Sequence, residues 1–130
     1  MTTNADITLY NYSERDGVYY SSQIRGVNWH GTQASTVNKG LDTADVYSLR
    51  IPVHARFGGK RYVPHKQWEA LPADEKAKAW TLCEGDIIVQ ELVEGDLKQI
   101  RKEYETVAVT SFTDNRRGSA AAQHWRVMAK

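Results

Sequence analysis

The stretch that decides the fold is Val18-Tyr19-Tyr20-Ser21-Ser22-Gln23-Ile24-Arg25-Gly26-Val27-Asn28-Trp29-His30. Its first half alternates between apolar and polar residues, so that Tyr20 and Ile24 share one face of a strand. After Gly26 the alternation resumes one residue out of step, and Trp29 carries it on. A phase change at a glycine is typical of a β-bulge, so we expect one long, bent strand over residues 18–30. Bent strands suit barrels better than flat sheets.

Shorter pieces repeat this alternation along the chain. Further strands are predicted at residues 7–11, 47–53, 62–63, 107–112 and 125–127. We also expect a hairpin over residues 80–89 that turns at Glu84-Gly85-Asp86. A short helix is predicted from Pro64, with an interruption at Pro72 and a further turn or two over residues 73–79. A second helix or ordered connection is expected over residues 97–104.

These elements predict a mainly β protein, a small antiparallel β-barrel or sandwich with one or two short helices. The chain has 130 residues and no repeat, low-complexity tract or linker, so residues 1–130 are expected to form a single domain. Residues 31–45 are small, polar and without period, and are predicted to be a long loop between early strands. A loop of this length in a compact domain is usually functional or mobile.

The net charge is close to zero, but the charges are unevenly distributed. Seventeen basic and sixteen acidic residues give a formal charge of +1, which argues against a surface wholly devoted to nucleic acid. Residues 1–63 sum to +2, residues 64–105 to −4 and residues 106–130 to +3. Opposed charged regions can pair with a copy of the same chain, or can be two solvated faces without a partner. No apolar run is long enough to span a bilayer, and the first residues lack signal-peptide features, so no membrane partner is expected.

Catalytic motifs are missing, so no catalytic, cofactor-binding or metal-ligating residues are assigned, and the chain is not expected to be an enzyme. The four histidines are far apart in sequence, and none has metal-ligand spacing to another or to the single cysteine, Cys83. Cys83 is expected to be a small buried hydrophobe. Glu84 and Asp86 flank a glycine and indicate turn chemistry, and Gly58-Gly59-Lys60 is predicted to be a turn.

Aromatic residues are abundant, with four Trp and seven Tyr. Most of the four Trp are expected in the core, but a barrel this small is not expected to bury every Trp and Tyr, so some of them should face a partner. The polar segment Asp114–Ser119 connects the last two predicted strands. Its Arg116 and Arg117 could contact phosphates, pair with carboxylates of a neighbouring subunit, or lie in a solvated turn.

Several segments together resemble the minor capsid proteins of tailed bacteriophages, which are encoded among the head-tail joining genes. The resemblance covers nearly the whole chain in order. The segments that carry it are residues 6–11, 24–29, 44–52, 62–64, 80–82, 85–89, 109–119 and 124–127.

The resemblance implies a head-completion protein of the head-closure, or stopper, type, located at the neck of the virion and assembled in the host cytoplasm. Such proteins are small β-barrels that form a ring, here a hexamer or dodecamer, between the portal or adaptor and the tail-terminator or tail-tube protein. The ring retains packaged double-stranded DNA. No cofactor is implied.

By the same analogy, the 31–45 loop is the gate in the lumen of the ring. The residues assigned to it are Gly31, Ser35, Thr36, Asn38, Lys39 and Gly40. Asp114, Asn115, Arg116 and Arg117 are assigned to a subunit or tail contact. Two alternatives stay open: a tail-completion or tail-terminator ring protein, and, from another class, a soluble ligand- or nucleic-acid-binding β-barrel.

Overall fold

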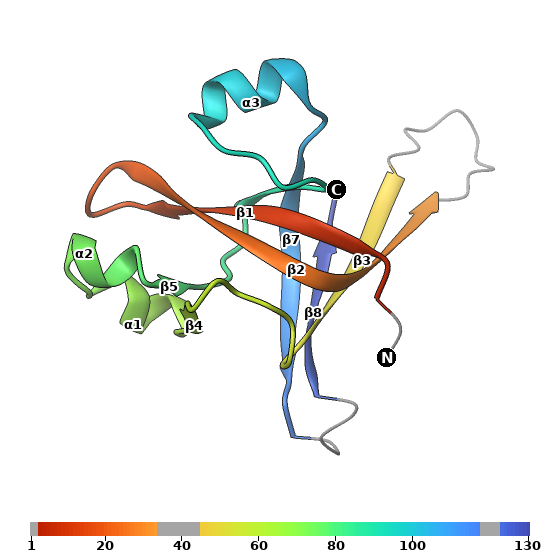
Figure 1. Ribbon diagram of the computed structural model, residues 1–130, viewed down its shortest axis with the longest axis horizontal. Helices are drawn as coiled ribbons and strands as arrows, with labels where there is room; N and C mark the ends of the chain where they lie inside the picture. Colours follow the sequence, from red (N-terminus) through yellow and green to blue (C-terminus); the bar gives the residue numbers. More distant parts are fainter. Residues whose placement is uncertain (1–2, 34–44, 118–122) are drawn as a thin grey trace.

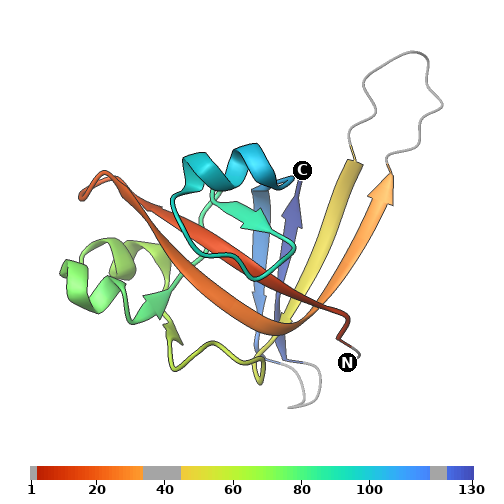
Figure 2. The same ribbon diagram turned by 45° about the horizontal axis from the view of Figure 1, so that its top comes forward.

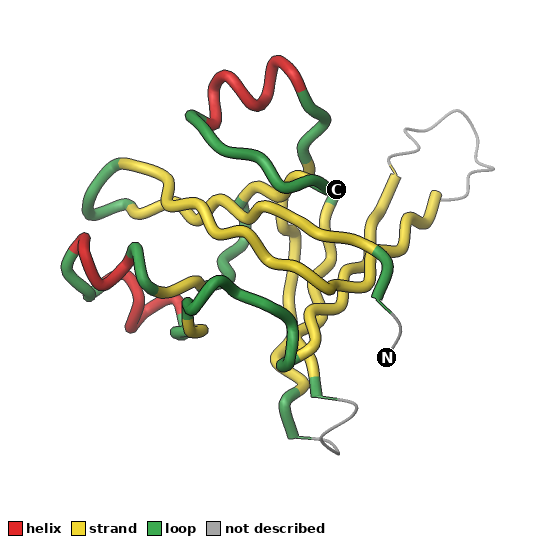
Figure 3. Tube along the Cα trace, in the orientation of Figure 1, coloured by secondary structure: helices red, strands yellow, loops and turns green. Residues whose placement is uncertain are grey.

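Six antiparallel strands close into a barrel in the order β1-β2-β3-β8-β7-β6 and back to β1 (Figures 1 and 3). The computed structural model describes residues 3–33, 45–117 and 123–130. The barrel strands are β1 (Ala5–Ser13), β2 (Val18–Gln33), β3 (Asp45–Pro52), β6 (Ile87–Val89), β7 (Val107–Asn115) and β8 (His124–Ala129). Two short strands, β4 (Arg61–Tyr62) and β5 (Ala79–Trp80), pair beside the barrel. The predicted mainly β barrel is confirmed.

The long bent strand is confirmed as β2, and its bend lies at Gly26. Gly26 has a φ of +86°, and the register with β1 shifts there, from Asp6 opposite Arg25 to Ala5 opposite Val27. Because of this extra residue, the buried side chains change phase from Ile24 to Val27. The two halves of β2 pair with different neighbours, β1 before the bend and β3 after it (Figure 2).

The barrel interior is filled by side chains. Its core includes Ile7, Leu9, Ile24, Leu49, Ile51, Leu82, Ile88 and Val127, each at most 1 % exposed. All four Trp are buried, more than the expected majority: three lie in this core, and Trp68 lies in a separate cluster with Val63 and Ala79. At one end, Trp80 and Trp125 meet edge to face with 4.8 Å between ring centroids. The guanidinium of Arg116 lies 5.1 Å from the Trp125 ring and covers this end of the barrel.

Three short helices pack on the outside of the barrel in the described residues. They are α1 (His65–Glu69), α2 (Ala73–Lys76) and α3 (Leu97–Glu103). The first two meet at Pro72, as predicted. The apolar side chains of α3, Leu97 and Ile100, pack with Tyr10 and with outward-facing residues of β6. None of the helices in the described residues has the length and apolar character needed to cross a membrane.

The predicted hairpin over residues 80–89 is wrong. β5 pairs in parallel with β4, whereas β6 inserts between β1 and β7. The turn at Gly85 redirects the chain, because Gly85 N and Val109 N bond to Val109 O and Asp86 O instead of to the preceding strand. The pairing of β6 with β1 and β7, which closes the barrel, therefore replaces the local pairing of β6 with β5 that the sequence suggested.

Two predicted loops begin later than expected because strand pairing extends into polar residues. β2 continues to Gln33 opposite Asp45, so both ends of the 31–45 segment belong to strands. β7 likewise continues through Asp114 and Asn115, which lie opposite Trp125 and His124. Residues 34–44 and 118–122 lie outside the described residues.

A fully buried lysine holds the β1–β2 hairpin against α1 and α2. Lys76 Nζ donates to Ser13 Oγ at 2.9 Å and to Asp16 Oδ2 at 3.1 Å. It also lies 3.8 Å from Glu69 Oε2 and 5.4 Å from the centroid of the Trp68 ring. One ammonium group thus joins the hairpin turn to both helices.

Replacing Lys76 with Met should therefore destabilise the protein strongly. The ammonium is lost while Asp16 and Glu69 remain partly buried beside the new apolar side chain. We expect the free energy of unfolding to fall by about 3 kcal/mol. Urea denaturation followed by tryptophan fluorescence measures this. The matched control is Lys78→Met at an exposed site, with an expected change within about 0.5 kcal/mol; equal effects of the two substitutions would contradict the assigned role.

Candidate functional site

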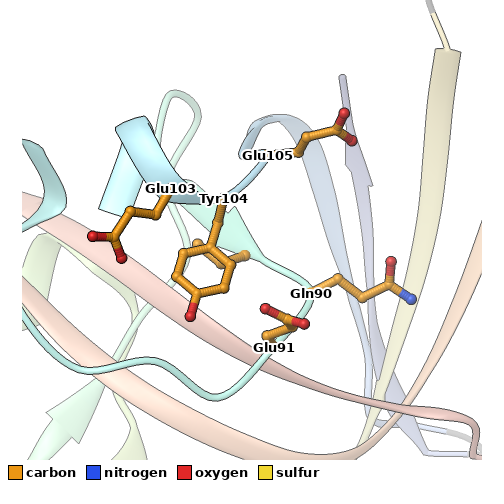
Figure 4. Close-up of a pocket in the computed structure, with 6 residues that line it drawn as sticks. Gln90, Glu91, Glu103, Tyr104 and Glu105 are labelled. Carbon is orange, nitrogen blue, oxygen red and sulfur yellow. The ribbon is translucent and has the colours of Figure 1, made fainter. Parts of the chain in front are cut away.

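An acidic groove lies between the loop that follows β6 and the C-terminal end of α3. Figure 4 shows Glu91 beside the Tyr104 ring, with the side chains of Glu103, Glu105 and Gln90 pointing outward from it. The hollow has a volume of about 290 Å³ and is lined by Val89, Gln90, Glu91, Glu103, Tyr104 and Glu105. A neighbouring hollow of about 530 Å³ shares Gln90, Glu91 and Tyr104 and adds Asp6 and Leu92. We call Asp6, Glu91, Glu103, Tyr104 and Glu105 the acidic groove.

Local bonds fix both walls of the acidic groove. On one wall, Thr8 Oγ1 donates to Glu91 O at 2.7 Å and accepts from Val93 N at 2.9 Å, which ties the loop to β1. On the other, Tyr104 N donates to Ile100 O at 2.8 Å and ends α3. Buried Leu97 and Ile100 anchor that helix. The backbone of the groove is therefore well supported, although its carboxylates are exposed.

The chemistry of the acidic groove favours positively charged partners. Exposed carboxylates with a phenol and an amide can accept hydrogen bonds from ammonium or guanidinium groups. Among residues 3–33, 45–117 and 123–130, no group of three or more His, Cys, Asp or Glu side chains is arranged to hold a metal ion. The groove thus offers hydrogen-bond acceptors that suit basic side chains.

A second hollow, of about 440 Å³, lies beside Lys60. Its lining includes Arg25, Phe57, Lys60 and Glu94. Lys60 Nζ donates to Ser21 O at 2.7 Å and to Ser22 Oγ at 3.0 Å. Partial burial lowers the pKa of Lys60. Two of the three ammonium protons thus bond the predicted turn at Gly58-Gly59-Lys60 to β2.

Asp86 is the most strongly perturbed ionisable group of the fold. Its side chain accepts from Asn11 Nδ2 at 2.8 Å, from Cys83 N at 3.0 Å and from Tyr12 N at 3.3 Å. Burial raises the pKa of Asp86 to about 6, and these hydrogen bonds only partly oppose the rise. The bond from Cys83 N confirms that Asp86 stabilises the turn at this position. The same carboxyl also ties the start of β6 to β1.

Cys83 differs from the expectation in its exposure, because the turn holds it half-buried. Burial raises the pKa of its thiol, and the nearby carboxylates of Asp86 and Glu84 raise it further. A raised pKa keeps the sulfur protonated and weakly nucleophilic.

Most residues assigned to the gate lie outside the described residues, namely Ser35, Thr36, Asn38, Lys39 and Gly40. Gly31 is described, and it lies in β2 opposite Tyr47 rather than in a loop. A Cβ at Gly31 would come within 3.1 Å of the Tyr47 ring. Close packing against this ring therefore explains the glycine.

The residues assigned to a subunit or tail contact lie at the end of the β7–β8 pair. Arg116 forms a bidentate pair with Asp114, with contacts of 2.6 to 2.9 Å, and stacks over Tyr62 and Trp125. Arg116 and Asp114 therefore bind each other within the chain. Arg117 is exposed and Asn115 half-buried, and their part in an intermolecular contact stays a prediction.

Sequence reasoning did not identify the acidic groove, Lys76 or the buried role of Asp86. The carboxylates of the groove come from three separate segments and carry no common spacing. The only available signal was the excess of acidic residues between positions 64 and 105. Asn11, a polar residue that continues the alternation of Ile7 and Leu9, could have indicated the buried network around Asp86.

The raised pKa of Asp86 predicts a specific pH dependence of stability. The folded state binds this proton more tightly than the unfolded state, so stability falls as the pH rises from about 4 to above about 6. Asp86→Asn removes the titration. Relative to wild type, we expect this variant to gain about 1 kcal/mol in unfolding free energy between pH 5 and pH 7.5, measured by urea denaturation. Glu84→Gln, at the exposed neighbouring carboxyl, should show no such gain; a parallel profile for all three proteins would refute the assignment.

Comparison with known proteins supplies a family but no activity. Searches of curated proteins and of solved structures returned no significant match. One family model matches residues 1–130, and its description is a family of unknown function, DUF6751. Because the match spans the whole sequence, the chain belongs to the DUF6751 family.

Proposed function

We propose that this chain is a structural subunit of the bacteriophage neck, a head-closure protein that forms a ring between portal or adaptor and tail. In that role it would retain packaged DNA by blocking the lumen of the ring. The proposal combines the resemblance of the sequence to phage minor capsid proteins with the geometry of the β2–β3 hairpin.

The hairpin is the observation that carries the proposal. The last β3–β8 pair is Tyr47 with Ala129, whereas β2 and β3 stay paired beyond it, as far as Gln33 with Asp45. In Figure 2 the two strands lean away from the rest of the barrel. A hairpin that extends beyond the barrel can reach a neighbouring subunit or a central channel. A head-closure ring requires such an extension.

The filled core supports an assembly rather than a single barrel as the functional unit. Side chains such as Leu9, Leu49 and Val127 occupy the interior, so nothing as wide as duplex DNA can pass through one chain. A channel for DNA therefore has to form between copies. In a ring, each copy would direct the end of its β2–β3 hairpin toward that channel.

Exposed aromatic side chains provide further surface for partners. Tyr12 and Tyr19 lie opposite one another on β1 and β2, each 40 % exposed, with 5.0 Å between ring centroids. Tyrosines presented in this way are common at protein interfaces. We assign this pair to a contact with the portal or adaptor or with the tail, and the mechanism is mechanical rather than chemical.

Particles assembled without this protein test the proposal. We expect filled heads that lose their DNA and lack tails, because nothing closes the portal channel. Negative-stain electron microscopy and a nuclease-protection assay of head DNA measure this, and supplying the wild-type gene in trans should restore tailed particles.

Two outcomes would replace the proposal. DNA-retaining heads accompanied by tails of aberrant length would assign the tail-terminator role instead. Normal infectious particles, or a gene that lies in a metabolic operon away from portal and capsid genes, would exclude a role in the neck.

A further inference from the structure

One outer face of the barrel carries two arginines directly opposite each other. Arg50 on β3 lies opposite Arg126 on β8, and both side chains are exposed. The row is completed by Asn28 on β2 and Thr113 on β7. We call this surface the basic face: Asn28, Ser48, Arg50, Thr113, Arg126 and Met128.

No ion pair neutralises the arginines of the basic face in the described part of the chain. Like charges directly opposite each other on a sheet destabilise it. Asp114, the acidic residue of β7, points to the other face and is held by Arg116. Two exposed guanidinium groups side by side present a site that an anionic surface can bind.

A complementary surface lies on the opposite wall of the barrel. In the closed order β1-β2-β3-β8-β7-β6, the β3–β8 junction is three strands away from the β6–β1 junction. The acidic groove adjoins that second junction, since Glu91 follows β6 and Asp6 begins β1. Its well-supported backbone and exposed carboxylates match the requirements of two guanidinium groups.

We infer that copies of this chain associate front to back, the basic face of one copy docking at the acidic groove of the next. Arg50 and Arg126 of one copy would pair with Glu91 and Glu105 of its neighbour. Because the two surfaces differ and lie on opposite walls, the contact is heterologous, and repeating it gives a ring when the rotation closes. The inference rests on the proposed function only for ring closure, and the pairing of the two surfaces can be tested in solution.

Charge reversal on each surface provides the test. Variant one is Arg50→Glu with Arg126→Glu, and variant two is Glu91→Lys with Glu105→Lys. Each variant places like charges on both sides of the contact, so each alone should self-associate about tenfold or more weakly than wild type. Mixed in equal amounts, the two variants regain opposite charges at every contact and should associate again.

Sedimentation equilibrium of the full-length protein measures this association. Wild type should associate as its concentration rises toward about 1 mM and should dissociate as salt rises from about 0.05 M to about 0.5 M. The control is Arg61→Glu with Lys66→Glu, which changes the net charge equally at exposed sites of β4 and α1. This control should self-associate as wild type does, which shows that the change in net charge alone does not weaken the contact. Thermal melts followed by circular dichroism establish that all variants are folded.

Three outcomes would overturn the inference. Wild type could remain monomeric throughout the concentration range, or variant one could associate as wild type does. The mixture could also fail to recover. If variant one instead loses binding to a short labelled DNA duplex while self-association is unchanged, the basic face serves nucleic acid. Because these measurements use purified protein, failure here is distinct from failure of the particle experiment that tests a neck role.

Discussion

The fold depends on one bent strand, β2, which pairs with a different neighbour along each of its halves. β2 pairs with β1 along its first half and with β3 along its second, and the extra residue at Gly26 allows the change. A positive φ of +86° at that position suits glycine and strains other residues. Without the bend, the apolar residues after Gly26 would face solvent. The closed order that separates the basic face from the acidic groove therefore follows from this bulge.

Local pattern was sufficient to predict much of this barrel but not how it closes. The phase change at Gly26, the interruption at Pro72 and the burial of most Trp were predicted from neighbouring residues. The partners of β6 were not, because Ile87–Val89 is short and apolar on both faces and could pair with any strand. Its position depends on Asp86, whose hydrogen-bond partners include Asn11, 75 residues away.

The candidate site was harder to predict than the fold for the same reason. Lys76 has the spacing of an ordinary surface residue in a charged helix, and only the docking of the β1–β2 hairpin buries it. The opposition of Arg50 and Arg126 likewise exists only once β3 and β8 are paired in register. The acidic excess of residues 64–105 and the basic excess of residues 106–130 can be counted in the sequence. The wall of the barrel on which each charge lies depends on the strand order.

The near-zero net charge acquires a physical meaning from this arrangement. A chain with a strong net charge would repel its copies at long range. With a formal charge of +1 this repulsion is small, so short-range contacts determine whether copies associate. Exposed ion pairs are individually weak, so two arginines and their carboxylates can hold neighbours together only loosely. Closure of a ring makes each further contact intramolecular and multiplies such weak contacts. A subunit of this kind would remain separate when dilute and would assemble where a template concentrates it.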